Sequence, residues 1–321
     1  MKITVNNRTL EVSGERTLLE ELRDAGCDIP SLCYAGKAKH EASCMVCMVR
    51  DVATSQMLPS CSTFPTEGMQ LDTESEDVKN MRRMSLELLL SDHRADCEAP
   101  CVVVCPAKID VARVILHYDR GQMDKAKAVL RETASADQLP CVGCKASCEK
   151  ACRRGTLDTA VSVRAIIEEV AKYKAEIPNT ASSAAKVQHS FSSKLGRYSE
   201  AEKEWLKEVY NQPSRCLHCA CEGKDKCKLR EYASQAGIKS SRYGVSSHQM
   251  VKEQQHVSGR LYYEPAKCVR CGLCVYNSRN GFTFQHRGFD MQVLIPEENK
   301  AHIDEHLADL CPTGALFLRQ D

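Results

Sequence analysis

The organisation of the chain is decided near its N-terminus by residues 42–47, which read ASCMVC. This stretch holds Cys44 and Cys47, and Cys33 and Cys61 flank it on either side. Two close cysteines with one on each side can give two thiolates to each of two irons, so the pattern predicts a [2Fe–2S] cluster. The long loop between Cys33 and Cys44 suits a single zinc ion poorly.

Composition indicates metal ligation in the rest of the chain as well. Of the 321 residues 20 are cysteines, whereas aromatic residues make up only 5%. The start of the chain lacks the apolar segment of a secretory signal, and no apolar stretch is long enough to span a membrane, so we expect a cytoplasmic protein. Grouped cysteines in a reduced compartment are more often metal ligands than disulfides. The net charge of +1 provides no basic field that would favour nucleic-acid binding.

Hydrophobic periodicity and turn residues predict short strands and helices around these cysteines. Strands are expected over residues 2–5, 9–12, 282–284 and 291–295. Helices are expected over residues 18–23, 75–91, 110–133 (a pair broken at Gly121) and 160–174. Residues 178–196 predict a linker, and a capping box of Ser199 and Glu202 predicts a helix after it. Cys27 follows the first helix and is expected to be an inert packing residue.

A second group of potential ligands is large enough for two [4Fe–4S] clusters. Its members are His93, Cys97, Cys101, Cys105, Cys141, Cys144, Cys148 and Cys152. Cys105 is followed by a proline, which is a frequent feature of such ligands.

A third group consists of four cysteines within twelve residues: Cys216, Cys219, Cys221 and Cys227. Four thiolates so close in sequence can surround Zn²⁺ tetrahedrally or hold a [4Fe–4S] cluster. The spacing leaves both occupants open, although the neighbouring groups favour the cluster.

The fourth group is a bacterial ferredoxin ligand set, made of Cys268, Cys271, Cys274 and Cys311, with a proline after the last cysteine. Residues 275–278 read VYNS and supply no cysteine for a second cluster. This part of the chain is therefore expected to hold one [4Fe–4S] cluster.

The first and last groups resemble a known family of electron-transfer subunits. Residues 28–34 (DIPSLCY) and 42–47 are similar to the N-terminal ferredoxin domain of the large iron–sulfur subunit of respiratory complex I, and of related formate dehydrogenases and iron hydrogenases. Residues 267–274 (KCVRCGLC) and 311–316 (CPTGAL) extend the resemblance. It implies a β-grasp fold at the N-terminus, and residues 88–93 (LLLSDH) match the region whose cluster takes one histidine and three cysteines.

From Cys97 to about Tyr173 the chain resembles the di-cluster domain of the glutamate synthase small subunit, which dihydropyrimidine dehydrogenase and electron-bifurcating transhydrogenases share. Residues 105–110 (CPAKID) and 144–155 (CKASCEKACRRG) carry this resemblance. It implies two interleaved clusters. The implied first ligand set is His93, Cys97, Cys101 and Cys152. The implied second set is Cys105, Cys144, Cys148 and either Glu168 or Cys141, with Glu168 slightly favoured.

Together these patterns predict an α+β protein in four parts: a β-grasp 2Fe-2S ferredoxin domain over residues 1–74, a helical di-cluster 4Fe-4S domain over 75–177, a linker with a four-cysteine metal site over 178–260, and a ferredoxin-like 4Fe-4S domain over 261–321. The expected cofactors are one [2Fe–2S] cluster, three or four [4Fe–4S] clusters and, if the third group binds zinc, one Zn²⁺.

The expected function is single-electron relay between flavoprotein partners in an NAD(P)H- and ferredoxin-linked complex of the electron-bifurcating transhydrogenase type. No Gly-x-Gly occurs, so the dinucleotide fingerprint is absent, and no substrate-binding active site is expected. The resemblances imply two partners: one like the NADH- and FMN-binding subunit of complex I, and one like the FAD- and NAD(P)H-binding glutamate synthase small subunit. Ferredoxin is a further candidate partner. The alternatives are a diaphorase-side subunit of a formate dehydrogenase or hydrogenase, and a zinc-rich scaffold without a redox role.

Overall fold

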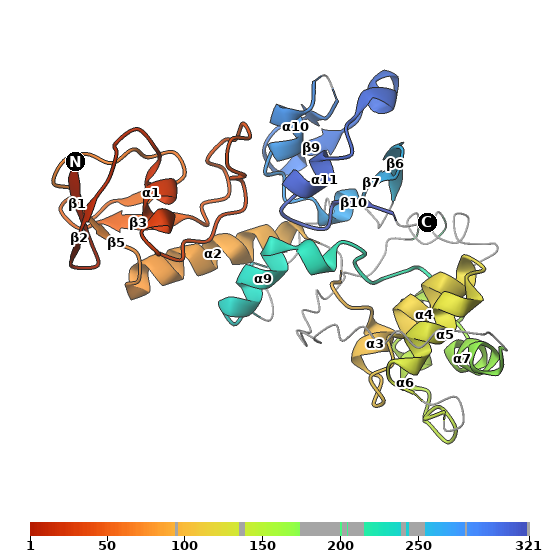
Figure 1. Cartoon of the computed structure of the whole chain (residues 1–321). Helices are drawn as coiled ribbons and strands as arrows, with labels where there is room; N and C mark the ends of the chain where they lie inside the picture. The colour runs from red at the N-terminus through yellow and green to blue at the C-terminus, as the bar shows by residue number, and fades with distance from the viewer. Residues whose placement is uncertain are drawn as a thin grey trace. The chain divides into compact units, whose positions relative to one another are not determined.

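The computed structural model describes residues 1–93, 96–134, 139–173, 200, 204, 215–238, 242–243, 254–279 and 281–319. Two compact units make up the chain (Figure 1). Unit 1 comprises Met1–Arg94 and Glu222–Asp321, and unit 2 comprises Ala95–Cys221. The expected linker over residues 178–196 and the expected capping box of Ser199 and Glu202 lie outside the described residues.

A five-stranded mixed sheet forms the N-terminal part of unit 1, with strand order β2-β1-β5-β3-β4. Its strands are β1 (Lys2–Val5), β2 (Arg8–Glu11), β3 (Met48–Asp51), β4 (Met57–Pro59) and β5 (Gln70–Asp72). Asn6 and Asn7 both have positive φ, as a two-residue hairpin turn requires. Helix α1 (Leu18–Asp24) buries Leu18, Leu19 and Leu22 against this sheet. The sheet agrees with a 2Fe-2S ferredoxin domain, and the mixed content confirms the α+β class.

The long helix α2 (Glu76–Asp92) follows the sheet and confirms the helix expected over residues 75–91. Within unit 1 it packs against α9 (Lys228–Gln235). The Arg83 guanidinium donates a hydrogen bond of 2.9 Å to the Ala236 carbonyl. The segment after residue 222 is thereby attached to the N-terminal part of the same unit.

The C-terminal part of unit 1 has its own core, which contains Leu261, Phe282, Val293 and Leu316. Its strands are β6 (Gln255–Ser258), β7 (Leu261–Tyr263), β8 (Thr283–Gln285), β9 (Gln292–Leu294) and β10 (Leu316–Leu318). They form a three-stranded sheet of order β10-β7-β6 and the hairpin β8-β9. The helical segments are η2 (Lys224–Lys226), η3 (Pro265–Lys267), α10 (Leu273–Asn277), η4 (Gly288–Asp290), η5 (Glu297–His302) and α11 (Leu307–Leu310).

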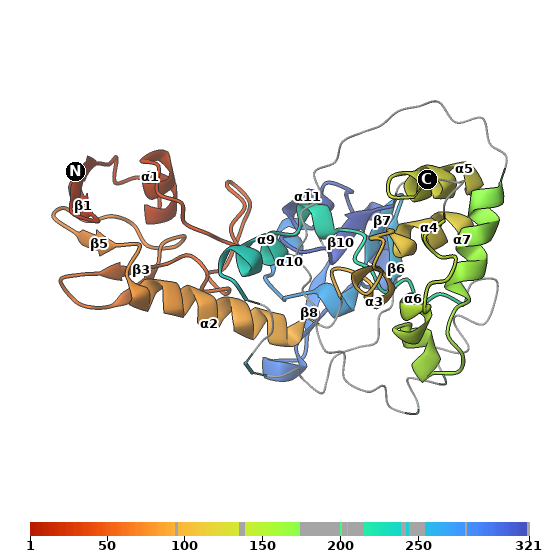
Figure 2. The same ribbon diagram turned by 90° about the horizontal axis from the view of Figure 1, so that it is seen from below.

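Unit 2 is helical in its described part. Its elements are α3 (Pro100–Val103), α4 (Val111–Asp119), α5 (Met123–Arg131), α6 (Ser147–Lys150), η1 (Arg153–Thr156) and α7 (Val163–Lys172). The expected helix pair is confirmed, because α4 ends before Gly121, which takes a φ of 69°. Helices α4, α5 and α7 pack around Val114, Ile115, Leu130 and Ile167 and lie side by side in both views (Figures 1 and 2).

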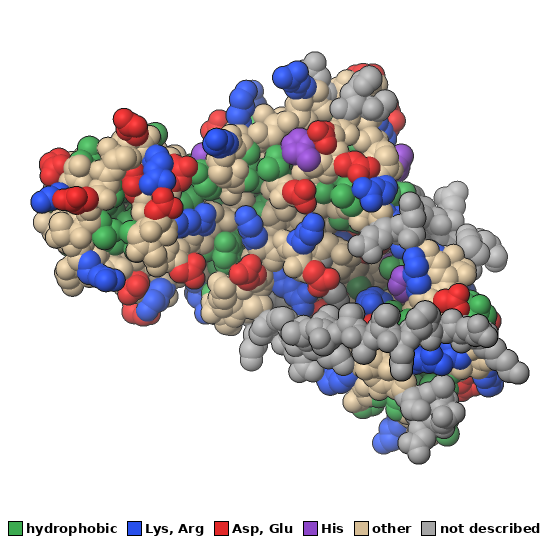
Figure 3. Space-filling model, in the orientation of Figure 1, with side chains coloured by type: hydrophobic (Ala, Val, Ile, Leu, Met, Phe, Trp, Pro, Cys, Tyr) green, Lys and Arg blue, Asp and Glu red, His purple; other side chains and the backbone are tan. Residues whose placement is uncertain are grey.

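The surface carries both signs of charge. On the face in Figure 3, Lys and Arg side chains alternate with Asp and Glu side chains, in agreement with the net charge of +1. Among the helices that the structure describes, none has both the length and the apolar character needed to cross a membrane.

Candidate metal centres

The first cysteine group converges on one buried point in unit 1. Cys33 and Cys44 lie in the loop between α1 and β3, Cys47 directly precedes β3, and Cys61 follows β4. Each of the four is at most 5% exposed. Cys33 shares side-chain hydrogen bonds with Cys44 and Cys61, and Cys47 shares one with Cys61. The structure therefore brings together all four predicted ligands of the [2Fe–2S] cluster.

The electrostatics of this group favour the thiolate form, which binds iron, at Cys33 and Cys47, whereas hydrogen bonding to these two sulfurs raises the pKa of Cys44 and Cys61. Hydrogen bonds from the Cys44 and Cys61 thiols lower the pKa of Cys33 to about 2. The Cys61 thiol likewise lowers the pKa of Cys47 to about 6. The backbone N–H groups of Ser43 and Cys44 lower the pKa of Cys33 further. Four buried sulfurs with backbone donors aimed at them fit a [2Fe–2S] cluster.

Neighbouring contacts hold these loops in place. The Ser60 hydroxyl donates a hydrogen bond of 2.7 Å to the Cys47 carbonyl, and His40 Nε2 lies 3.2 Å from the Cys61 carbonyl oxygen. Cys27 packs against the core of this part, and burial raises the pKa of its thiol. This environment agrees with the expectation of an inert packing cysteine.

The fourth group converges in the same way in the C-terminal part of unit 1. Burial raises the pKa of Cys271 and Cys274, and the neighbouring thiolates, including Cys311, raise it further. Burial also raises the pKa of Cys268, an effect opposed by a hydrogen bond from the Tyr263 hydroxyl. Cys268, Cys274 and Cys311 also pack against the same core. The ferredoxin-type ligand set is thus assembled around one point.

The loop of the first group is tied directly to the helix that carries Cys274. Asn277, the last residue of α10, accepts a hydrogen bond of 2.9 Å from the Lys39 N–H and donates one of 2.8 Å to the Lys39 carbonyl. The Cys33 sulfur also contributes to raising the pKa of Cys271. The two sites are therefore neighbours within unit 1.

Unit 2 gathers four further cysteines. Cys105 follows α3, Cys141 and Cys144 lie on the loop before α6, and Cys148 lies in α6. Burial raises the pKa of Cys141 to about 11, with added contributions from the thiolates of Cys105, Cys148 and Cys144. Glu168 makes the smallest contribution, and it is exposed on α7. Cys141, one candidate for the last ligand of this cluster, thus lies near the other three, and Glu168, the other candidate, lies near Cys141.

The remaining predicted ligands divide between the units. His93 and Cys227 are buried residues of unit 1, and Cys227 Sγ accepts a hydrogen bond of 3.5 Å from the Arg230 N–H. In unit 2 the Cys221 N–H donates a hydrogen bond of 3.2 Å to the Cys97 carbonyl. Of the other members in unit 2, Cys101, Cys152 and Cys216 pack against the same core, and Cys219 lies on the loop that carries Cys216.

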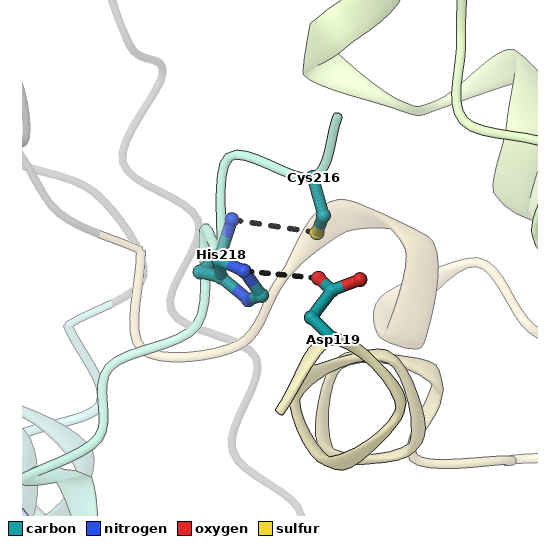
Figure 4. Close-up of side chains that lie close together, drawn as sticks. All are labelled: Asp119, Cys216 and His218. Carbon is teal, nitrogen blue, oxygen red and sulfur yellow. Dashed lines mark hydrogen bonds and ion pairs between the residues drawn. The ribbon is translucent and has the colours of Figure 1, made fainter. Parts of the chain in front are cut away.

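Two residues beside these cysteines were not singled out in the sequence. His218 lies between Cys216 and Cys219, and its Nε2 atom is 3.1 Å from Asp119 Oδ2 at the end of α4 (Figure 4). The only sequence signal is a histidine inside a Cys-x2-Cys loop. Nothing in the sequence connects that loop with Asp119, because the helix pair brings Asp119 to it.

Comparison with known proteins supports the iron–sulfur interpretation. Residues 1–76 match the family described as a 2Fe-2S iron-sulfur cluster binding domain. The chain is 32% identical over 166 residues to NADP-reducing hydrogenase subunit HndD of Solidesulfovibrio fructosivorans, covering 47% of this chain and 27% of that protein. It is 31% identical over 97 residues to a subunit of the NADH-quinone oxidoreductase of Rhizobium meliloti, covering 30% and 11%. It is 29% identical over 97 residues to the alpha subunit of the NADPH-Fe(3+) oxidoreductase of Geobacter sulfurreducens, covering 30% and 12%.

A likeness in fold extends over more of the chain. A chain in the crystal structure of an NAD⁺-reducing [NiFe]-hydrogenase in the H₂-reduced state aligns with a TM-score of 0.53 and 16% identity, covering 99% of this chain and 87% of that one. The sequence relatives are much longer, since the chain covers about a quarter of their length or less. The chain is thus an iron–sulfur protein related to subunits of NADH- and NADPH-linked oxidoreductases and hydrogenases.

Proposed function

We propose that the chain is a multi-cluster electron-transfer subunit of a flavin-containing, NAD(P)H-linked oxidoreductase complex. Bound iron–sulfur clusters supply one-electron chemistry, which complements the hydride chemistry of nicotinamide and flavin cofactors. The relatives support this role, since they are subunits of an NADP-reducing hydrogenase, an NADH-quinone oxidoreductase and an NADPH-Fe(3+) oxidoreductase.

The observation that carries the proposal is the pair of hydrogen bonds that joins the two ligand sets of unit 1. Asn277 and Lys39 fix the loop after Cys33 against α10 by two hydrogen bonds. The cysteines of the first set are buried, and those of the second set are half-buried. A metal site that only stabilises a fold does not require a fixed neighbour, whereas a relay requires its centres to be held at a constant short separation.

The sharper form of the proposal is an electron-bifurcating transhydrogenase that also uses ferredoxin. Its clusters would be one [2Fe–2S] and three or four [4Fe–4S]. The part over residues 1–74 would face a subunit like the NADH- and FMN-binding subunit of complex I. The part over residues 75–177 would face an FAD subunit like the glutamate synthase small subunit. The cysteines gathered at Cys105, Cys144 and Cys148 support the di-cluster interpretation of this second part.

A second candidate function is the diaphorase-side subunit of a hydrogenase or formate dehydrogenase, whose catalytic metal a different subunit holds. The hydrogenase relative and the hydrogenase fold likeness favour this candidate. Purification of the native complex separates the two, because nickel, molybdenum or hydrogen-oxidising activity would co-purify with the second candidate only. Two flavin subunits without any of these would support the transhydrogenase.

The test of the general proposal is the iron, acid-labile sulfide and zinc content of anaerobically purified protein, together with EPR of the reduced sample. One [2Fe–2S] and four [4Fe–4S] clusters predict about 18 iron per chain. About 14 iron with one zinc would mean that one four-cysteine site is structural. Little iron with several zinc would instead support a zinc-rich scaffold and refute the proposal.

The connection between the two ligand sets is tested by Asn277→Ala. This variant removes both hydrogen bonds to Lys39 and leaves every cysteine ligand in place. We expect full iron content but weaker magnetic interaction between the two centres of unit 1, measured by EPR relaxation. Asn80→Ala, at an exposed position of α2, is the control and should leave the interaction unchanged. An unchanged interaction in Asn277→Ala would remove the observation on which the relay rests.

A further inference from the structure

The segment from Arg215 to Cys221 is attached to unit 2 at three separate points. Arg215 donates a hydrogen bond of 2.9 Å to the Thr159 carbonyl. His218 Nε2 is 3.1 Å from Asp119 Oδ2 on α4 (Figure 4). The Cys221 N–H donates to the Cys97 carbonyl at 3.2 Å. These contacts fix the position of Cys216 and Cys219 within unit 2, independently of the residues after Cys221.

The loop over residues 216–219 shares two backbone features with the ferredoxin-type loop over residues 268–271. The third residue of each loop is left-handed, with a φ of 44° at His218 and 54° at Arg270. In both loops the N–H of that residue donates to the first cysteine sulfur, at 3.4 Å. Backbone concavities of this kind, in which N–H groups point at one spot, bind anions and iron–sulfur clusters.

The second residue completes the likeness. Leu217 is 6% exposed and Val269 is 7% exposed, so each loop is anchored by a buried aliphatic side chain. In the Cys141-x2-Cys144 loop the corresponding residue, Val142, is 80% exposed. The loop over residues 216–219 is therefore built like the loop of the C-terminal cluster site, and its second residue is more deeply buried than that of the loop over residues 141–144.

Two other cysteines of unit 2 face this loop. Cys101 lies in α3, Cys152 directly precedes η1, and both pack with Cys216 against the same core. Both are half-buried there, as is Cys216. The neighbouring Arg153 guanidinium holds Asp96 at 2.5 Å, which fixes the segment after Cys152 against the segment before Cys97.

We infer that Cys101, Cys152, Cys216 and Cys219 together hold one [4Fe–4S] cluster inside unit 2. The inference rests on the proposed iron–sulfur function and assigns ligands within it. It differs from the ligand sets expected from the sequence, in which Cys101 and Cys152 belong with His93, and Cys216 and Cys219 belong with Cys221 and Cys227.

A zinc ion fits these four thiols less well. Thiolates bound to one zinc at about 2.3 Å would all approach one another to within a few ångströms. Among the residues that the structure describes, the three potential ligands found within 4.8 Å of one another are Asp119, Cys216 and His218. No three of the four thiols meet this limit, so the side chains do not form the tight group that a single zinc ion requires. His218 then orients its loop through Asp119 and is not a ligand.

The grouping is tested by iron and sulfide content of the anaerobically purified full chain in three variants: Cys101→Ser, Cys219→Ser and the double variant. If both cysteines serve one cluster, the double variant loses about four iron, no more than either single variant. A loss of about eight iron would overturn the inference, because the cysteines would then serve two clusters. The control, Cys101→Ser with Cys271→Ser, should lose about eight.

A second pair of variants keeps every thiol and covers the case in which a serine variant fails to fold. His218→Val forces a β-branched residue into a left-handed conformation, and Arg153→Ala removes the bond to Asp96. Both should shift the same EPR component if one cluster is shared, and shifts in two different components would overturn the inference. His218→Gly, which tolerates the conformation and keeps the N–H but loses the contact with Asp119, should shift that component less than His218→Val does.

The outcomes also separate this inference from the proposed function. Little iron in the unmodified protein would refute the function itself. Normal iron in the unmodified protein with about eight lost in the double variant would refute only the grouping. One zinc per chain that is lost in Cys219→Ser but kept in Cys101→Ser would also refute the grouping.

Discussion

In the N-terminal site of unit 1 the four ligands lie within residues 33–61, whereas the cysteines that meet in unit 2 extend from Cys101 to Cys219. The first site is formed by loops at one end of a small sheet, so its geometry depends on short-range structure. The second depends on how α3, α6 and the segment over residues 215–221 pack around the α4–α5–α7 core. A site assembled from distant segments is more sensitive to changes elsewhere in its unit.

The largest expected effect is in unit 2. Cys144→Ser should remove about four iron, because Cys144 lies with Cys105, Cys141 and Cys148 in one set. The EPR signal of the [2Fe–2S] cluster should persist, since its ligands belong to the other unit. Iron analysis and EPR provide the measurement, and loss of every cluster would show that the two units do not fold separately.

A smaller loss is expected in unit 1. Cys44→Ser should remove about two iron and the [2Fe–2S] signal alone. Cys27→Ser is the matched control, because Cys27 belongs to the same part of the unit but packs against the core. If Cys27→Ser also lost iron, the assignment of the N-terminal ligands would be wrong.

A third prediction concerns the stability of unit 1 near Cys268. Lys267 and Glu264 form an ion pair of 2.6 Å with both side chains 0% exposed. Glu264→Ala should cost about 3–5 kcal/mol, because it leaves a buried charge without its partner. Glu297→Ala is a matched control, since Glu297 and Lys300 have the same spacing and distance but Glu297 is 83% exposed. The control should cost about 0–1 kcal/mol, and equal shifts in the urea midpoint of the two variants would contradict the prediction.

The smallest expected effect is a pH dependence in unit 2. The Arg154 guanidinium lies 2.6 Å from Asp158 and holds the pKa of that carboxyl below its ordinary range. The pair therefore stabilises the fold fully above the unfolded pKa of about 4, and this stability is lost as the pH falls toward the lower folded value. Asp158→Asn should reduce stability at pH 7 and flatten the acid side of the profile, measured by circular dichroism. Asp124→Asn, at an exposed position of α5, should change neither.

Much of the local structure was predictable. The β1–β2 hairpin, helices α1, α2 and α7, the break at Gly121 and the strands β8 and β9 all occur where the periodicity and turn residues indicate. These features depend on neighbouring residues, which the sequence displays directly. The spacing of the cysteines also allowed Cys33 to be grouped with Cys61, and Cys268 with Cys311. Each of these two ligand sets belongs to one compact part of unit 1.

By itself, then, the sequence determined which residues can bind metal, the two ferredoxin-type ligand sets and the positions of the main helices. Only the tertiary structure decided that Asn277 ties α10 to Lys39, that Asp119 meets His218, and that Cys216 packs against the same core as Cys101 and Cys152. The physical reason is the range of the interactions involved. Spacing within one loop limits which thiolates can converge, but helix packing determines which of several possible partners from distant segments they meet.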